Sequence, residues 1–134
     1  MGKAKKRILC VEDDQDSCDM LAKFLGILGY EVVSANSGAD ALRLAREQRF
    51  DTYVLDNWLV DMSGVELCKR IRALDPHTSI IFYSAAAKKS DYEEAMSAGA
   101  QSYISKPGNL DELGNTIPSL LKSVNGKGNS ETVH

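Results

Sequence analysis

Five short apolar runs alternate along the chain with longer amphipathic stretches, and this alternation is the feature that most limits the possible folds. The runs are Arg7–Val11, Glu31–Ala35, Thr52–Leu55, Ser79–Tyr83 and Ser102–Ser105. Between them, apolar residues recur every three or four positions, as at Met20, Phe24 and Leu28, which is typical of a helix with one buried face. Apolar strands that alternate with helices indicate a parallel sheet covered on both sides. We therefore predict an α/β fold with a doubly wound, five-stranded parallel sheet and helices on both faces.

The chain has the length of one domain, and its charge is unevenly distributed. In 134 residues a second hydrophobic core would be cramped. The net charge is −3, yet residues 1–6 are basic, so the body of the chain is distinctly acidic. We predict a basic lead at residues 1–6, one domain over residues 7–124 and a flexible tail at residues 125–134. Because an acidic body lacks the basic stripe of nucleic-acid-binding proteins, we expect no direct nucleic-acid binding.

The apolar segments and the cysteines point to a protein of the cytoplasm. No apolar run approaches the roughly 18 residues that a membrane-spanning helix needs, and the run after the basic lead is too short for a signal peptide. The three cysteines, Cys10, Cys18 and Cys68, contain no C-x-x-C pair, and their odd number disfavours a disulfide framework. We expect buried free thiols in a cytoplasmic protein without membrane association.

Several candidate caps mark the starts of the predicted helices. Three polar residues are followed three positions later by glutamate, as in a capping box: Ser63 with Glu66, Ser90 with Glu93, and Asn109 with Glu112. Asp16 suits the start of the first helix. The last helix contains Gly114 and Pro118, and an internal proline removes a backbone hydrogen bond, so the segment either kinks or breaks into two pieces. We expect one kinked helix.

Carboxylates gather where two of the predicted strands end. Glu12, Asp13 and Asp14 follow the first strand, and Asp56 follows the third. In an open α/β sheet, ligands bind beyond the carboxyl ends of the strands, where the strand order reverses. If these two strands are neighbours, the carboxylates repel one another unless a cation compensates their charge. Oxygen ligands of this kind favour Mg²⁺.

A hydroxyl and a lysine complete the set. Ser84 lies at the end of the fourth strand, and Lys106 directly follows the fifth. Either residue alone would indicate little, because such positions often hold a cap or a solvated charge. Together with the acids they provide a carboxylate nucleophile, a metal-binding pair, a hydroxyl donor and a fixed cation. This combination suits phosphoryl transfer to Asp56.

Six short motifs in order make the chain similar to a known family. They are Ile8 to Asp14 (ILCVEDD), Asp51 to Asp56 (DTYVLD), Met62 to Gly64 (MSG), Phe82 to Ala85 (FYSA), Gly99 with Ala100, and Tyr103 to Pro107 (YISKP). Over residues 6–124 the sequence resembles the receiver domain of bacterial-type two-component response regulators, including the single-domain chemotaxis regulator. The resemblance implies a flavodoxin-like sheet with strand order 2-1-3-4-5.

The resemblance also implies a role for each site residue. Asp56 would be the phosphoacceptor, receiving a phosphoryl group from a phosphohistidine of a sensor histidine kinase or phosphotransfer protein. Glu12, Asp13 and Asp56 would hold Mg²⁺, and the backbone carbonyl of Trp58 would be the remaining protein ligand. Lys106 would pair with the phosphoryl oxygens.

Two further residues would carry the signal outward. Ser84 resembles the switch hydroxyl, and Tyr103 resembles the aromatic switch residue, although an aromatic residue in an edge strand is otherwise most often a packing residue. The signal would reach a downstream protein target through the face formed by the fourth helix, the fifth strand and the fifth helix. A homodimer is possible as well.

The sequence departs from the family pattern at a few positions, and one alternative stays open. Val60 stands where proline is common, and Gly108 where a large apolar residue is usual, which puts the partner surface in doubt rather than the phosphorylation site. The alternative is a receiver-like interaction module that is regulated without phosphoryl transfer. We do not expect a classical enzyme, because Trp58 cannot serve as the acid or base that aspartyl-phosphate phosphatases carry two residues past the nucleophile.

Overall fold

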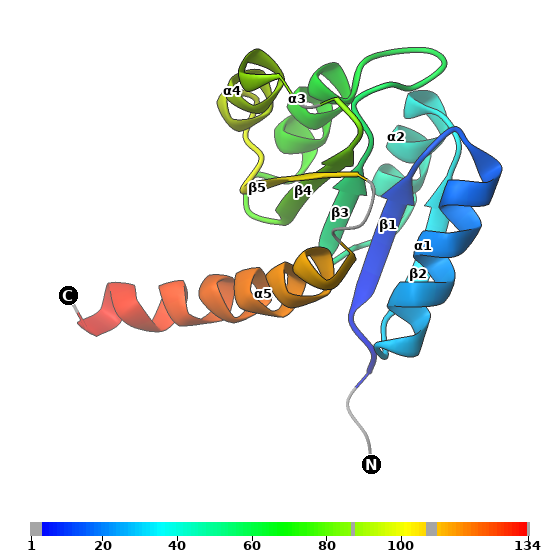
Figure 1. The fold of residues 1–134 in the computed structure, drawn as a ribbon. Helices are drawn as coiled ribbons and strands as arrows, with labels where there is room; N and C mark the ends of the chain where they lie inside the picture. The colour runs from blue at the N-terminus through cyan, green and yellow to red at the C-terminus, as the bar shows by residue number, and fades with distance from the viewer. Residues whose placement is uncertain (1–3, 87, 107–109, 134) are drawn as a thin grey trace.

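The computed structural model describes residues 4–86, 88–106 and 110–133, and side chains as far as residue 122. The strands are β1 (Arg7–Val11), β2 (Glu31–Ala35), β3 (Thr52–Leu55), β4 (Ser79–Ser84) and β5 (Ser102–Ser105). The helices are α1 (Gln15–Ile27), α2 (Gly38–Glu47), α3 (Gly64–Leu74), α4 (Lys89–Ser97) and α5 (Leu110–Val133). All strand pairs are parallel, in the order β2-β1-β3-β4-β5 (Figure 1). The predicted fold class and strand order are confirmed.

The sheet separates two hydrophobic clusters because successive side chains of a strand point to opposite faces. Along β1, Leu9 and Val11 pack with the cluster that α2, α3 and α4 cover. Ile8 and Cys10 pack on the other face, with α1 and α5. β3 and β4 are buried along their whole length, as expected of parallel strands covered on both sides. The three cysteines are buried and free, as predicted.

Helix starts follow the predicted chemistry at one site and differ at two. Ser63 caps α3, and its Oγ accepts the Glu66 N–H at 3.0 Å. The prediction for Ser90 was wrong: α4 starts two residues earlier, and the Asp91 carboxylate accepts the N–H of the capping Lys88 at 3.0 Å. Asp16 is not the N-cap of α1 either: Asp14, two residues earlier, accepts the Ser17 N–H at 3.0 Å, and Asp16 lies in the first turn. The predicted cap Asn109 lies outside the described residues.

Helix α5 is one continuous helix across Gly114 and Pro118, so the prediction of a single helix rather than two pieces is confirmed. A Cβ on Gly114 would lie 3.2 Å from both Phe24 Cζ and Leu28 Cδ1, so the glycine lets α5 pack closely against α1. The helix continues to Val133, so residues 125–133 are helical, and the flexibility predicted for residues 125–134 stays a prediction. Each added residue gains a backbone hydrogen bond once a helix is nucleated, and no proline follows Pro118.

Among the described residues, no helix is both long and apolar enough to cross a bilayer.

Candidate functional site

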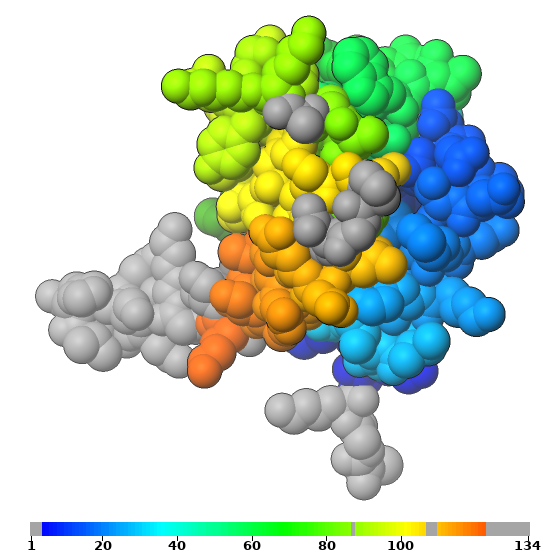
Figure 2. Space-filling view, in the orientation of Figure 1, coloured from blue at the N-terminus to red at the C-terminus, as the bar shows by residue number. Residues whose placement is uncertain are grey.

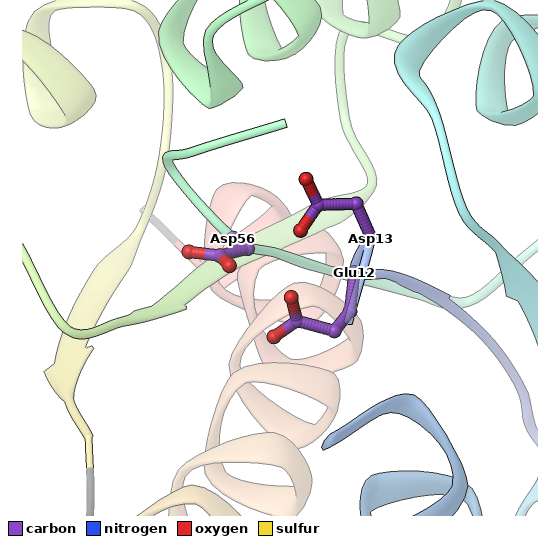
Figure 3. A group of neighbouring side chains, drawn as sticks. All are labelled: Glu12, Asp13 and Asp56. Atoms are coloured by element: carbon purple, nitrogen blue, oxygen red, sulfur yellow. The ribbon is translucent and has the colours of Figure 1, made fainter. Parts of the chain in front are cut away.

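Three carboxylates meet at the carboxyl ends of β1 and β3. These strands are neighbours, with Val11 paired to Leu55, and the Asp56 N–H donates to the Val11 carbonyl at 3.0 Å. The next residues along each strand, Glu12, Asp13 and Asp56, therefore face one another (Figure 3). Oxygen atoms from all three side chains lie within 4.8 Å of one another. The structure thus brings together the acidic residues that the sequence predicted as one site.

The cluster is unevenly buried, and burial governs its charge. Glu12 and Asp56 are buried, whereas Asp13 is exposed. Burial, with a smaller contribution from Asp56, raises the pKa of Glu12 to about 7, in spite of the opposing hydrogen bond from Lys106. Burial lowers the pKa of Lys106, but the hydrogen bond to Glu12 and the charge of Asp56 outweigh it, so the net direction is upward. Lys106 is therefore a permanent cation inside an acidic pocket.

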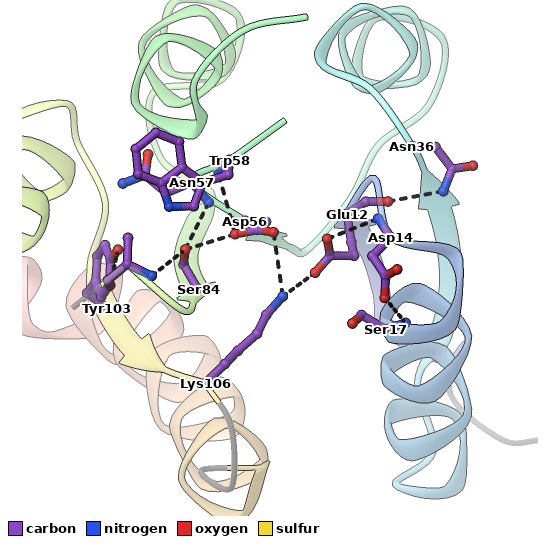
Figure 4. Close-up of polar contacts among 11 residues, drawn as sticks. Glu12, Asp14, Ser17, Asn36, Asp56, Asn57, Trp58, Ser84, Tyr103 and Lys106 are labelled. Carbon is purple, nitrogen blue, oxygen red and sulfur yellow. Dashed lines mark hydrogen bonds and ion pairs between the residues drawn. The ribbon is translucent and has the colours of Figure 1, made fainter. Parts of the chain in front are cut away.

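The two carboxylate oxygens of Asp56 have different surroundings (Figure 4). Oδ2 faces Lys106 Nζ at 3.5 Å, and the same ammonium group donates a hydrogen bond to Glu12 Oε1. Oδ1 accepts the hydroxyl of the buried Ser84 at 2.8 Å and the N–H of Trp58 at 3.4 Å. Donors from β4, β5 and the loop after β3 thus surround one carboxylate. Such an arrangement suits a group whose oxygens must carry additional negative charge.

Ser84 and Tyr103 contact the backbone of the same residue, Ala86. The Ser84 Oγ accepts the Ala86 N–H at 3.3 Å, and the Tyr103 hydroxyl donates to the Ala86 carbonyl at 2.7 Å. The Tyr103 ring stacks on Phe82, with the centroids 5.4 Å apart and the planes at 5°. Burial raises the pKa of Tyr103, so its hydroxyl stays a donor at neutral pH. A continuous chain of hydrogen bonds therefore runs from Asp56 through Ser84 and Ala86 to Tyr103.

The loop after β3 brings the start of α3 unusually close to Asp56. The Gly64 N–H donates to the Asn57 carbonyl at 2.8 Å, and Trp58 pairs with Ser63 across the loop. A Cβ on Gly64 would lie 2.3 Å from the Asp56 carbonyl oxygen, so only glycine fits there. The predicted metal ligand at Trp58 is the backbone carbonyl, so the side chain is not needed for that role. The Trp58 side chain is 64% exposed.

Sequence reasoning missed one residue that shapes this loop. The Asp61 carboxylate accepts the N–H groups of Gly38 at 2.8 Å and Ala39 at 2.9 Å, and it thereby caps α2 from a distant part of the chain. These hydrogen bonds lower the pKa of Asp61. A local capping pattern could not reveal this contact, because the cap and the helix are more than 20 positions apart. Gly64 belongs to the motif Met62 to Gly64, but its steric role depends on the packing of α3 against the loop.

Comparison with known proteins assigns the family. The sequence model of the response regulator receiver domain matches residues 8–118. The chain belongs to the response regulator receiver domain family. This receiver domain is 37% identical over 121 residues to the transcriptional regulatory protein ZraR of Salmonella typhimurium, a match that covers 90% of the chain and 27% of ZraR. It is 36% identical to the transcriptional regulatory protein PrrA of Mycobacterium tuberculosis, covering 90% of the chain and 52% of PrrA.

Solved structures agree with the fold. A CheY-like response regulator receiver domain protein from Methanospirillum hungatei superposes with a TM-score of 0.88 at 31% identity, covering 92% of this receiver domain and 99% of that chain. The response regulator TrrA from Thermotoga maritima, solved in complex with Mg²⁺-BeF, gives a TM-score of 0.79 at 32% identity, covering 86% and 98%. The receiver domain thus spans nearly all of these solved chains, but only about a quarter to a half of the curated relatives.

Proposed function

We propose that this receiver domain is a phosphorylation-dependent signalling switch. Asp56 accepts a phosphoryl group from a phosphohistidine on a sensor histidine kinase or a phosphotransfer protein, with Mg²⁺ bound at the acidic cluster. The observation that supports this most strongly is the surroundings of Asp56, where Glu12, Lys106 and Ser84 converge on one carboxylate. The relative TrrA, which was solved with Mg²⁺-BeF, supports the same chemistry for this pocket.

The donor atoms of the pocket fit a hard divalent cation. Glu12, Asp13 and Asp56 supply only carboxylate oxygens, which are the ligands that Mg²⁺ prefers. Three carboxylates meet here, and Lys106 is the one cation paired with them among the described residues, so the cluster carries excess negative charge. We propose that these three side chains and the backbone carbonyl of Trp58 hold the ion. When bound, it neutralises charge on the carboxylates and on the incoming phosphoryl oxygens.

The residues of the chain perform the transfer around a positioned nucleophile. An Asp56 carboxylate oxygen attacks phosphorus, the new P–O bond forms, and the P–N bond to the donor imidazole breaks with its electron pair leaving on nitrogen. Lys106, held beside Glu12 and Asp56, compensates charge on the phosphoryl oxygens. The Ser84 hydroxyl, which now donates to Asp56, is placed to donate to the phosphoryl group instead.

A change at Ser84 would reach the partner surface through Ala86. The Ser84 Oγ accepts the N–H of Ala86, and the Tyr103 hydroxyl donates to its carbonyl. A shift of the Ser84 hydroxyl would therefore alter both contacts. Tyr103 belongs to β5, and Figure 2 shows β5, in yellow, between α4 in yellow-green and α5 in orange. We propose that a downstream protein, or a second receiver domain, binds this α4–β5–α5 face. We also propose the cytoplasm as the location, since the three thiols are free.

A mass measurement tests the proposal. The protein is incubated with Mg²⁺ and a small phosphodonor such as acetyl phosphate, and the intact protein is then weighed. We expect a gain of one phosphoryl group that needs Mg²⁺ and is absent from Asp56→Asn. The control Asp61→Asn alters a carboxylate of the same loop outside the acidic cluster and keeps the gain. If the unaltered protein gains no phosphoryl group, the alternative is favoured, a binding module regulated without phosphoryl transfer.

A further inference from the structure

A groove of about 840 Å³ lies between α3, α4 and the loop that follows β3. It is lined by two residues of that loop, by one side of α3 and by one side of α4: Asn57, Trp58, Ser63, Val65, Glu66, Lys69, Ser90, Asp91, Glu93, Glu94 and Ser97. None of these described lining residues belongs to β5 or α5. The groove therefore shares α4 with the α4–β5–α5 face but takes no described lining residue from β5 or α5.

The groove is acidic, and part of its charge is uncompensated. Glu66 pairs with Arg70 at 2.8 Å, and the Asp91 carboxylate is used by the N-terminus of α4. Glu93 and Glu94 have no ion-pair partner within the parts of the chain that the structure describes. Lys69 is the single cation among the described lining residues. Two free carboxylates on one wall therefore favour a cationic occupant.

An exposed tryptophan borders the same groove. Trp58 is the only tryptophan of the chain, and 64% of its surface is exposed, an uncommon state for so large an apolar side chain. Tryptophan is the best aromatic partner for a cation, and a planar guanidinium group stacks on it while still donating to carboxylates. Lysine lacks this planar geometry. The indole and the two glutamates together therefore match arginine better than lysine.

We propose that the α3–α4 groove binds an arginine-containing basic peptide segment of a partner protein. One guanidinium group stacks on Trp58, and a neighbouring basic side chain pairs with Glu93 and Glu94. Asn57 and Trp58 of the acceptor loop line the groove, and their N–H groups bind Ser84 Oγ and Asp56 Oδ1. An occupant would therefore contact the backbone that holds the phosphoacceptor.

Intrinsic fluorescence tests this proposal, since Trp58 is the sole indole. The protein is titrated at low salt with three capped six-residue peptides in which glycine alternates with arginine, with lysine or with glutamate. We expect a saturable change for the arginine peptide, a higher Kd for the lysine peptide and no change for the glutamate peptide. The Kd should rise with added salt. Absence of saturable binding, or equal Kd values for the arginine and lysine peptides, would overturn the proposal.

Matched variants locate the binding site. Glu93→Gln/Glu94→Gln should raise the Kd about three- to tenfold, as expected for two partly exposed charge contacts. Asp111→Asn/Glu112→Gln removes the same charge from the exposed first turn of α5 and should leave the Kd unchanged. Trp58→Leu, measured by calorimetry, should raise the Kd about two- to fivefold. An equal rise in Kd in both double variants would show only nonspecific electrostatic attraction and contradict the proposal.

A last variant separates this inference from the proposed phosphorylation. Asp56→Asn does not alter any lining residue, so it should bind the arginine peptide with an unchanged Kd while it fails to gain a phosphoryl group. If Asp56→Asn lost peptide binding, the groove would not be the site. Failure of phosphorylation in the unaltered protein would leave the peptide result standing.

Discussion

The surroundings of Asp56 and the α4 side of the molecule are packed to very different extents. All four residues of β3, which leads into Asp56, are buried, whereas only one of the four residues of β5 is buried. Helix α3 buries four residues, but α4 buries Ala95 alone. Asp56 is therefore fixed on a rigid base, while the elements proposed to report its state are weakly held. Regions with few buried contacts open and rearrange most easily.

The backbone of one residue, Ala86, joins the two regions. Ala86 is bound through its N–H by Ser84 and through its carbonyl by Tyr103. Ser84 is completely buried and belongs to the rigid part, while Tyr103 is only half-buried and belongs to the weakly packed part. Because these contacts are single hydrogen bonds, each contributes on the order of 1 kcal/mol and can be exchanged at low cost.

The largest effect on stability is expected at Gly64, which packs against the backbone of Asp56. Gly64→Ala should lower the free energy of unfolding by about 3 kcal/mol, because the new methyl group would overlap the Asp56 carbonyl oxygen, a backbone atom that cannot move alone. Urea denaturation measures this change. Gly26→Ala is the control: nothing lies within 4 Å of the added methyl group in α1, so stability should rise by up to about 1 kcal/mol. A loss below about 1 kcal/mol at Gly64 would show that the loop is not rigid.

The difference in packing between α3 and α4 can be measured directly by hydrogen exchange. Backbone amides in α4 should exchange with solvent at least about tenfold faster than those in α3, corresponding to about 1.4 kcal/mol less opening free energy. Hydrogen exchange followed by NMR, corrected for intrinsic rates, gives both values in one sample. The buried residues Leu67 and Ile71 of α3 have no counterpart in α4 beyond Ala95. Equal protection of the two helices would remove the difference on which the comparison rests.

The smallest expected effect concerns the anchor between the loop and α2. Asp61→Ala should lower the free energy of unfolding by about 1 kcal/mol at pH 7, as for the loss of a helix cap. Hydrogen bonds from Ala39 and Gly38 hold the folded-state pKa of Asp61 below its ordinary value of 3.8. The stabilisation is therefore complete above pH 3.8 and is lost as the pH falls through the folded-state pKa.

Urea denaturation at several pH values checks this dependence. The stability difference between the unaltered protein and Asp61→Ala should be constant near neutral pH and should shrink below about pH 4. Asp19→Ala, which removes an exposed carboxylate of α1, should change stability by less than about 0.5 kcal/mol at any of these pH values. A difference that persists unchanged at pH 2 would mean that the carboxylate charge is not what caps α2.

Much of the fold was predictable because it depends on local patterns. Each strand was located from its apolar run, and β4 differs only by including Ser84. The α3 cap at Ser63 followed from residue spacing alone. The errors at Asp16 and Ser90 have a common cause: several neighbouring polar residues could each cap the helix, and the one selected depends on which backbone N–H a carboxylate reaches in the folded chain.

The site was predictable in its membership but not in its contacts. Carboxylates at the ends of two strands had to meet once the strands were neighbours, so Glu12, Asp13 and Asp56 could be grouped without a structure. That Lys106 binds Glu12 as well as facing Asp56 depends on where the ammonium group comes to rest. The hydrogen bonds of Ser84 and Tyr103 to Ala86 likewise depend on side-chain positions that residue spacing does not predict.

The sequence by itself determined the order of the strands and helices, the buried faces and the identity of the acidic residues, because periodicity and residue chemistry act over a few neighbouring positions. Only the tertiary structure decided three further features: the steric need for Gly64, the capping of α2 by Asp61 and the groove beside Trp58. Each of these joins segments that are distant in the chain or depends on the close approach of two backbones. Such contacts arise from the packing of whole elements, which local sequence does not encode.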